Sequence, residues 1–275
     1  MVSIRKELAE YGLFPKKRLG QHFLVDRNIL NKVVRTAEVR KEEVVVEVGP
    51  GLGEMTLALA RLAKRVIAVE IDPKLVEILK KKLAGWPNVE VVKSDILKLD
   101  FKDFFKKERH PIKVVANLPY QVSTPLLFRF IEAKEFFSTL TLMLQREVAE
   151  RMVASPGGKK YGRLSVLLQM FLDLSVRFFI PPSAFFPSPK VESAVVQMVW
   201  KEKPMVDKQD EEWFIKVVKA SFGYRRKTLA NALKHSELSL PDSIESRIEE
   251  VGIDPRRRPE TLTLQEFSSL ADALK

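Results

Sequence analysis

Short apolar runs alternate with amphipathic segments between residues 43 and 200. The run VVVEV at 44–48 predicts a buried strand, because parallel strands covered on both faces read as nearly continuous apolar stretches. Similar runs predict strands over 66–70, 89–92, 113–117, 140–144, 174–179 and 194–199. A 3.6-residue period predicts helices over 54–63, from Asp72-Pro73 onward, after Ser123, and over 146–154 and 163–171.

This alternation predicts an α/β fold with a mostly parallel sheet and helices on both of its faces. No helical pattern separates the two last strands, so we expect them to form an antiparallel hairpin.

The two ends of the chain follow different patterns. Residues 1–42 form a basic arm with one predicted helix over 26–37. Residues 201–209 (KEKPMVDKQ) are typical of a linker, and only amphipathic helical segments follow them. We therefore expect an arm at 1–42, an α/β domain at 43–200 and, after the linker, a helical domain at 210–275. The helical segments lie near 210–222, 226–235, 242–251 and 263–274.

The net charge of +11 is concentrated in a few segments. Residues 1–41 hold ten Lys and Arg against four Asp and Glu, and residues 151–190 hold six against one. Such a surplus favours a nucleic-acid partner, because each cation paired with a phosphate releases a condensed counterion. The abundance of charge, with only 12 Asn and Gln, is also typical of thermophilic proteins, but this alternative does not explain the imbalance.

The composition excludes several other classes of protein. With 45% hydrophobic and 30% charged residues, the chain is neither disordered nor fibrous. The longest uncharged stretch, 114–128, contains Asn117 and two prolines, so we expect no membrane span. The first residues predict no export signal, and the absence of cysteine excludes disulfides and thiolate metal sites. We therefore expect a cytoplasmic protein without a bound metal.

A glycine-rich turn follows the first strand. Gly49 and Gly51 in EVGPGLGEMT lack a Cβ, so the backbone can turn tightly and approach a ligand. Glu70 ends the second strand, where its carboxylate can accept both hydroxyls of a ribose. Asp95 follows the third strand and either accepts from an adenine amine or caps a turn. The pattern predicts a nucleoside across the carboxyl ends of three strands, with a cationic centre near Glu47.

The fourth strand ends in the tetrapeptide NLPY, residues 117–120. The amine of adenine is a poor nucleophile, because its lone pair is delocalised into the ring. The side-chain oxygen of Asn117 and the carbonyl of Leu118 could accept its two hydrogens and aim that lone pair. Tyr120 offers a flat face on which an extruded base can stack. The tetrapeptide therefore indicates catalysis on an adenine amine by positioning.

At these residues the sequence resembles the S-adenosylmethionine-dependent rRNA adenine dimethyltransferases, and the resemblance covers nearly the whole chain. It implies a Rossmann-like class I methyltransferase sheet of seven strands, the last ones antiparallel, with a small all-α C-terminal domain. The motifs that carry it are KKRLGQHFL (16–24), EVGPGLGEMT, AVEID (68–72), SDIL, NLPYQVSTPLLF (117–128), MLQREVAERM (143–152), YGRLSV (161–166), PPSAFFPSPKVESAVV (181–196) and FGYRRKTLANAL (222–233).

The resemblance also implies roles for single residues. The second stacking aromatic would be Phe185 in AFFPSPKV, with Phe186 beside it as the alternative. S-adenosylmethionine would be bound by His22, Leu24, Gly49, Gly51, Glu70, Asp95 and Asn117. Contacts to RNA phosphates would come from three basic runs: Lys16, Lys17 and Arg18; Lys159, Lys160 and Arg163; and Arg225, Arg226 and Lys227.

The implied activity is dimethylation of two adjacent adenosines near the 3′ end of 16S rRNA, by a monomer acting within an assembling 30S subunit. A related activity on large-subunit rRNA, which confers antibiotic resistance, is one alternative, but the YRRKTL helix and the 157–163 loop favour the small subunit. An RNA-binding assembly factor whose methylation is dispensable is another. The intact set of Glu70, Asp95, Asn117 and Tyr120 argues against a purely non-catalytic protein.

Overall fold

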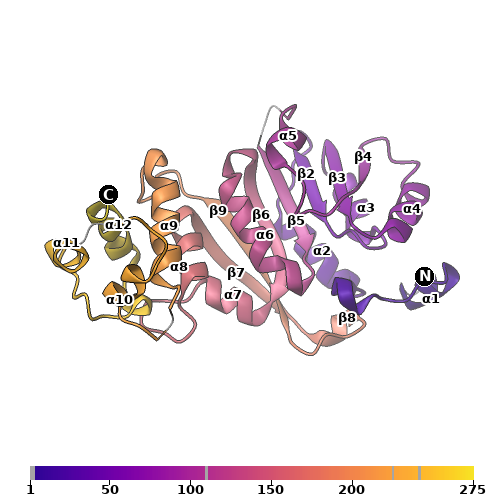
Figure 1. The fold of residues 1–275 in the computed structure, drawn as a ribbon. Helices are drawn as coiled ribbons and strands as arrows, with labels where there is room; N and C mark the ends of the chain where they lie inside the picture. Colours follow the sequence, from indigo (N-terminus) through magenta and orange to yellow (C-terminus); the bar gives the residue numbers. More distant parts are fainter. Residues whose placement is uncertain (1–3, 109–110, 225, 241–242) are drawn as a thin grey trace. The chain divides into compact units, whose positions relative to one another are not determined.

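The computed structural model describes residues 4–108, 111–224, 226–240 and 243–275 (Figure 1). The chain divides into two compact units, residues 1–149 with 175–200, and residues 150–174 with 201–275. None of the described helices combines the length and the apolar character that a membrane crossing requires.

A seven-stranded sheet forms the centre of the first unit, in the order β4-β3-β2-β5-β6-β9-β7. The strands from β4 to β6 are parallel, and β9 runs antiparallel to β6. The predicted fold class is therefore confirmed, with β9 as an antiparallel strand near the end of the sheet and β7 as its neighbour. The strands are β2 Val44–Val48, β3 Arg65–Glu70, β4 Val89–Lys93, β5 Ile112–Asn117, β6 Phe137–Gln145, β7 Leu172–Ile180 and β9 Ser193–Trp200.

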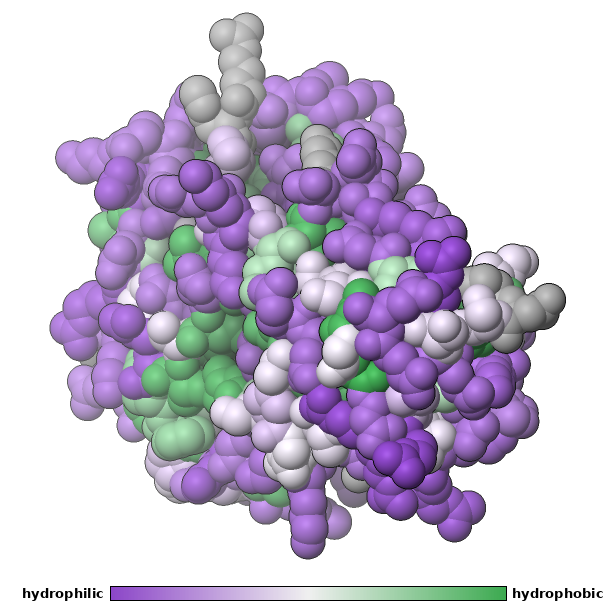
Figure 2. Space-filling model, turned by 90° about the vertical axis from the view of Figure 1, so that its left-hand side faces the viewer, coloured by the Kyte–Doolittle hydropathy of each residue, from purple (hydrophilic) through white to green (hydrophobic). Residues whose placement is uncertain are grey.

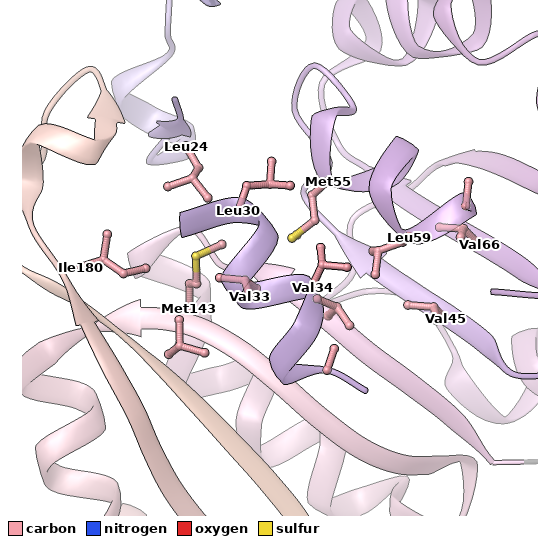
Figure 3. Packing of buried hydrophobic residues seen from close by; sticks show 14 of the residues in the cluster. Leu24, Leu30, Val33, Val34, Val45, Met55, Leu59, Val66, Met143 and Ile180 are labelled. Atoms are coloured by element: carbon pink, nitrogen blue, oxygen red, sulfur yellow. The ribbon is translucent and has the colours of Figure 1, made fainter. Parts of the chain in front are cut away.

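Helices α2 (Arg27–Thr36) and α3 (Glu54–Ala60) pack on the sheet through one apolar cluster. Figure 3 shows Val34 and Leu59 on the side of Val45, a residue of β2, and Val33 beside Met143, a residue of β6. Asp26 begins α2 as predicted, with its carboxylate accepting from the backbone N–H groups of the first turn. This packing fixes the start of α3, and with it the glycine turn that precedes the helix.

Helix α4 (Pro73–Lys82) begins as its sequence predicts, with Asp72 as N-cap and proline at the first position. Helix α6 (Tyr120–Glu132) begins four residues before the predicted start, which lay after Ser123. Ser123, expected to precede the helix, instead donates from its hydroxyl to the Tyr120 carbonyl within it, at 3.0 Å. The helix starts directly after Pro119, so Tyr120 is held in its first turn. The other helices between β4 and β7 are α5 Phe101–Phe105, η2 Lys134–Phe136, α7 Arg146–Met152 and α8 Arg163–Phe171.

The basic arm contains more structure than its sequence predicts. Helix α1 (Ile4–Glu10) buries Leu8 against Leu52, which belongs to the glycine turn. Lys82 of α4 forms ion pairs with Glu7 of α1 at 2.8 Å and with Glu54 at 2.9 Å. The rest of the arm forms η1 Lys17–Leu19 and β1 Phe23–Leu24, which pairs antiparallel with β8 Phe185–Phe186 after η3 Pro182–Ala184.

The second unit is helical and includes residues 150–174, which the sequence analysis assigned to the α/β domain. The reason is that α8 is apolar around most of its surface: seven of its nine residues are buried, so it requires a second partner. Phe171 packs edge-on against Phe214 of α9 (Glu211–Ser221), with ring centroids 6.4 Å apart. The later elements are η4 Lys208–Asp210, α9 Glu211–Ser221, α10 Leu229–Lys234, α11 Ile244–Glu250, η5 Pro259–Thr261 and α12 Leu264–Ala273.

Candidate active site

One pocket of the first unit lies where strands β2, β3 and β5 end. The arm supplies one of its walls, through Ile4 and residues 18–24. The pocket brings together nine of the residues that the sequence analysis assigned to the cofactor or to the chemistry: His22, Leu24, Gly49, Gly51, Glu70, Asp95, Asn117, Leu118 and Tyr120.

The glycine turn has a left-handed backbone at Gly49 (φ 68°) and at Gly51 (φ 60°), a conformation that favours glycine. A Cβ at Gly51 would lie 3.0 Å from the ring of Phe23, so this glycine allows a close approach of the arm. At Gly49 a Cβ would meet the Asn117 carbonyl oxygen at 3.8 Å, an ordinary contact. The glycine turn, which follows the first strand, therefore lies close to both the arm and the tetrapeptide, and these segments together form one wall of the pocket.

The Glu70 carboxylate is buried at the end of β3 and is held by backbone donors. Its Oε1 accepts from the N–H groups of Ile71 and Asp72, both at 2.9 Å, and its Oε2 accepts from Gly51 at 3.3 Å. Burial raises the pKa of Glu70, although these three donors oppose the shift. The donors fix the orientation of the carboxylate, and Oε2, which accepts from a single N–H group, keeps a second lone pair with which it can accept from a ligand hydroxyl.

Glu47 also lines the pocket and is 1% exposed. Neither of its carboxylate oxygens has a hydrogen-bond partner among the described residues. Burial raises the pKa of Glu47 to about 8, and the nearby charge of Glu70 adds to the shift. An unpartnered acid beside a second carboxylate fits a ligand that carries positive charge, such as the ammonium and sulfonium groups of S-adenosylmethionine.

Asp95 lines the pocket while it also caps a turn. Its Oδ1 accepts from Leu97 N–H at 3.0 Å, so the capping interpretation holds for one oxygen. Arg129 of α6 fixes the same loop by donating to the carbonyls of Ile96 at 2.7 Å and Leu99 at 2.5 Å. The sequence analysis missed Arg129, because its role depends on carbonyls that no motif encodes.

The side chain of Asn117 is oriented by the arm. Its Nδ2 donates to the His22 carbonyl at 2.9 Å, which leaves Oδ1 as the acceptor of the amide. Leu118 is 1% exposed, and its N–H donates to the Met143 carbonyl at 3.0 Å. Both residues that were expected to accept from an adenine amine are thus fixed by bonds to neighbouring segments.

Tyr120 is fixed at its ring and at its hydroxyl. The imidazole of His22 stacks on the ring, with centroids 5.5 Å apart and planes inclined by 27°. The hydroxyl lies 2.8 Å from Ser193 Oγ, and burial raises the pKa of Tyr120. His22 is held in turn by a bond from Nδ1 to the Pro187 carbonyl at 2.6 Å. Ser193 was not selected from the sequence, because it follows Tyr120 by 73 positions.

Neither Phe185 nor Phe186 is among the described residues that line this pocket. Phe185 is 4% exposed and packs in the core cluster with Leu24, its partner in the two-stranded sheet. Phe186 pairs with Phe23, and the Arg5 guanidinium lies 6.0 Å from its ring centroid. The identity of a second stacking aromatic therefore stays a prediction.

The three basic runs differ in their surroundings. Lys16 forms an ion pair with Asp72, whereas Lys17 and Arg18 are exposed, and Arg18 also lines the pocket. In the second unit, Lys159, Lys160 and Arg163 are exposed, and Lys160 pairs with Glu150. Arg226 is exposed, Lys227 Nζ lies 4.9 Å from the Tyr224 ring centroid, and Arg225 lies outside the described residues. Hydrophilic residues cover most of the face shown in Figure 2.

Comparisons with known proteins agree over nearly the whole chain. A family model described as "Ribosomal RNA adenine dimethylase" matches residues 14–275. "Ribosomal RNA small subunit methyltransferase A" of Shouchella clausii is 44% identical over 273 residues, which cover 97% of this chain and 92% of the relative. The protein with the same name from Bacillus mycoides is 42% identical over 276 residues, covering 98% and 94%.

Two solved structures show the same fold over most of this chain. A dimethyladenosine transferase from Plasmodium falciparum has a TM-score of 0.76 at 27% identity, covering 90% of this chain and 95% of its own. The 23S rRNA methyltransferase ErmE has a TM-score of 0.69 at 26% identity, covering 92% and 99%.

Proposed function

Because the chain belongs to the ribosomal RNA adenine dimethylase family, we propose that it dimethylates two adjacent adenosines near the 3′ end of 16S rRNA. It is an enzyme that methylates rRNA adenines with S-adenosylmethionine as the methyl donor. The choice of the small subunit is supported by the two relatives at 44% and 42% identity, both named as small-subunit enzymes. The fold alone does not separate the two subunits, since the 23S enzyme ErmE shares it.

S-adenosylmethionine supplies a methyl group on a positively charged sulfur, from which a nucleophile can displace it in line. The residues of the pocket fit this molecule in two respects. Glu70 and Asp95 supply acceptors for the ribose and the adenine at adjacent strand ends, and Glu47 supplies a buried carboxylate for a cationic centre. We assign these three residues, with Gly49, Gly51, His22 and Leu24, to cofactor binding.

The observation that carries the proposed chemistry is the orientation of Asn117. Its amide nitrogen is bound to the His22 carbonyl, so only its oxygen is presented as an acceptor to an incoming amine. With the Leu118 carbonyl as second acceptor, the two amine hydrogens of adenine would be held and its lone pair aimed at the methyl group. Tyr120, fixed by His22 and Ser193, would supply one stacking wall for the extruded base.

We assign RNA binding to the cations of the three basic runs, with the exception of Lys16. We propose that the enzyme is a monomer and that it acts on an assembling 30S particle in the cytoplasm. The basic surplus of residues 1–41 and 151–190 supports a phosphate-rich partner. The absence of cysteine supports a reducing compartment.

The test is single-turnover methyl transfer from labelled S-adenosylmethionine, at saturating cofactor, to 30S particles. The variant Asn117→Ala removes one oriented acceptor, and we expect the rate to fall by about a hundredfold or more while binding to 30S particles persists. Asn31→Ala, an exposed asparagine on α2, is the matched control and should react like the wild type. A rate of Asn117→Ala within about threefold of wild type would contradict the activation of the amine by Asn117.

Mapping the dimethyladenosine in the wild-type product tests the substrate. Two adjacent modified adenosines near the 3′ end of 16S rRNA are expected. Modification of isolated 23S rRNA in place of 30S particles would favour the large-subunit alternative. If Asn117→Ala restores 30S assembly in cells as well as the wild type does, binding is the essential role and methylation is dispensable.

A further inference from the structure

Residues 16–21 form a closed loop whose residues 18–21 line the pocket, and we call it the rim loop. The Lys16 N–H donates to Oε1 of Gln21 at 2.8 Å, so the side chain of the last residue closes the loop onto the first. Gly20 has a left-handed backbone with φ 60°, which turns the chain back toward Gln21. Because residues 18–21 line the pocket, the position of the rim loop determines the shape of this wall of the pocket.

Asp72 connects the rim loop to the residues assigned to the ribose. Its side chain is 3% exposed, and its Oδ2 lies 2.6 Å from Lys16 Nζ and accepts from Gln21 Nε2 at 3.3 Å. Its Oδ1 accepts from the Lys74 N–H at 3.1 Å, which caps α4. Its own N–H donates to Glu70 Oε1 at 2.9 Å. One buried residue therefore binds the rim loop, the start of a helix and the ribose acceptor.

The charge of Lys16 compensates a carboxylate that is removed from water. Burial acts to raise the pKa of Asp72, but the hydrogen bond and the charge of Lys16 hold it below its usual value. Without Lys16, the carboxylate would keep only the two neutral donors, Gln21 Nε2 and Lys74 N–H. A buried carboxylate that loses its cation is destabilised, so Asp72 would turn toward water and the rim loop would lose its attachment.

We propose that Lys16 is a positioning residue, whose ion pair with Asp72 keeps the rim loop closed over the cofactor pocket and thereby sets how long S-adenosylmethionine stays bound. This proposal rests on the assignment of the pocket to the cofactor. It separates Lys16 from its neighbour Lys17, which is exposed on η1 and keeps its assignment to RNA. The basic run at 16–18 thus divides between two tasks.

The experiment compares Lys16→Met with Lys17→Met, which removes the same charge one residue away. Calorimetry and stopped-flow dissociation are measured with S-adenosylmethionine and no RNA. We expect Lys16→Met to bind the cofactor about tenfold more weakly, mainly through faster dissociation, and Lys17→Met to bind like the wild type. Lys16→Arg should restore slow dissociation, since a guanidinium can also pair with Asp72.

In methylation assays on 30S particles, Lys16→Met should raise KM for the cofactor while kcat at saturating cofactor stays within about twofold of wild type. The double variant Lys16→Met with Asp72→Asn should lose much less cofactor affinity than the sum of the losses in the two single variants. The reason is that either single change already breaks the ion pair. Lys16→Met with wild-type cofactor dissociation would overturn the proposal, as would strictly additive effects. Wild-type protein that binds the cofactor but does not methylate 30S particles would contradict the proposed function instead.

Discussion

The cofactor end and the amine end of the pocket differ in the groups that they present. The cofactor end consists of Glu47, Glu70 and Asp95, three carboxylates of which the first two are almost completely buried. The amine end consists of neutral groups, Asn117, Leu118 and Tyr120, which are oriented by bonds from other segments.

This difference matches what each ligand requires. A cationic cofactor favours the ionised form of acidic groups beside it, and this attraction gives affinity. A neutral adenine amine gains from acceptors held in one orientation, and orientation gives rate. We therefore expect changes at the cofactor end to act on binding and changes at the amine end to act on turnover.

After Asn117→Ala, the largest effect is expected for Tyr120→Ala, which removes the stacking wall at the amine end. Stacking on an aromatic side chain contributes about 1–3 kcal/mol per base, so single-turnover methylation should fall by up to about a hundredfold. Tyr120→Phe keeps the ring and loses only the bond to Ser193, and it should retain most of the rate. If Tyr120→Ala weakened only the binding of cofactor, the division between the two ends would be wrong.

The next effect concerns Glu70→Ala at the cofactor end. Each lost hydrogen bond to a buried acceptor costs about 1–3 kcal/mol, so cofactor binding should weaken by roughly ten- to hundredfold in calorimetry. Glu77→Ala on α4 is an exposed control that removes the same side chain, and it should bind normally. Unchanged affinity in Glu70→Ala would remove this residue from the ribose site.

Glu47 gives a pH-dependent test of the same end in the ligand-free protein. Its folded-state pKa of about 8 lies above the ordinary 4.5, so the native state loses stability as the pH rises from about 5 to 8. Glu47→Gln removes this loss, and its stability advantage should grow by about 1 kcal/mol per pH unit across that range. Denaturant unfolding of both proteins at several pH values measures this difference in stability. A difference that does not change with pH would contradict the raised pKa of Glu47.

The smallest effect is expected outside the pocket, for the triple Ala variant of Arg225, Arg226 and Lys227. If these residues contact phosphates, the variant should bind 30S particles several-fold more weakly, with the salt slope reduced by up to about 0.9 per lost contact. Cofactor binding should not change at all. Wild-type particle binding and salt dependence would mean that this run is only a solvated surface.

The sequence predicted most of the fold that positions the pocket. The apolar runs identified the strands because buried parallel strands leave a strong local pattern, and Asp72-Pro73 marked the start of α4. The start of α6 was wrong, since Ser123 resembles a cap but bonds back to Tyr120 inside the helix. Helix α1 was missed, because its one fully buried residue, Leu8, gives too weak a period.

The sequence identified those pocket residues that belong to local motifs, such as Glu70 and Asn117. The bonds that orient them were not predictable, because they join distant parts of the chain. Lys16 reaches Asp72 across 56 positions, and Ser193 reaches Tyr120 across 73. From sequence alone, Lys16 is one more cation in a basic run. Only its distance from a buried carboxylate gives it another role.

The short pairing of β1 with β8 also determines when the cofactor site can form during synthesis of the chain. Phe23 pairs with Phe186, and His22 bonds to the Pro187 carbonyl, so the pocket's wall depends on residues made about 160 positions later. The glycine turn, Glu70, Asp95 and NLPY all leave the translating ribosome before that anchor does. A nascent chain therefore carries every cofactor-binding motif while it still lacks a finished binding site. The nascent chain can therefore bind the cofactor only late in translation, after β8 has been synthesised and β1 of the arm can pair with it.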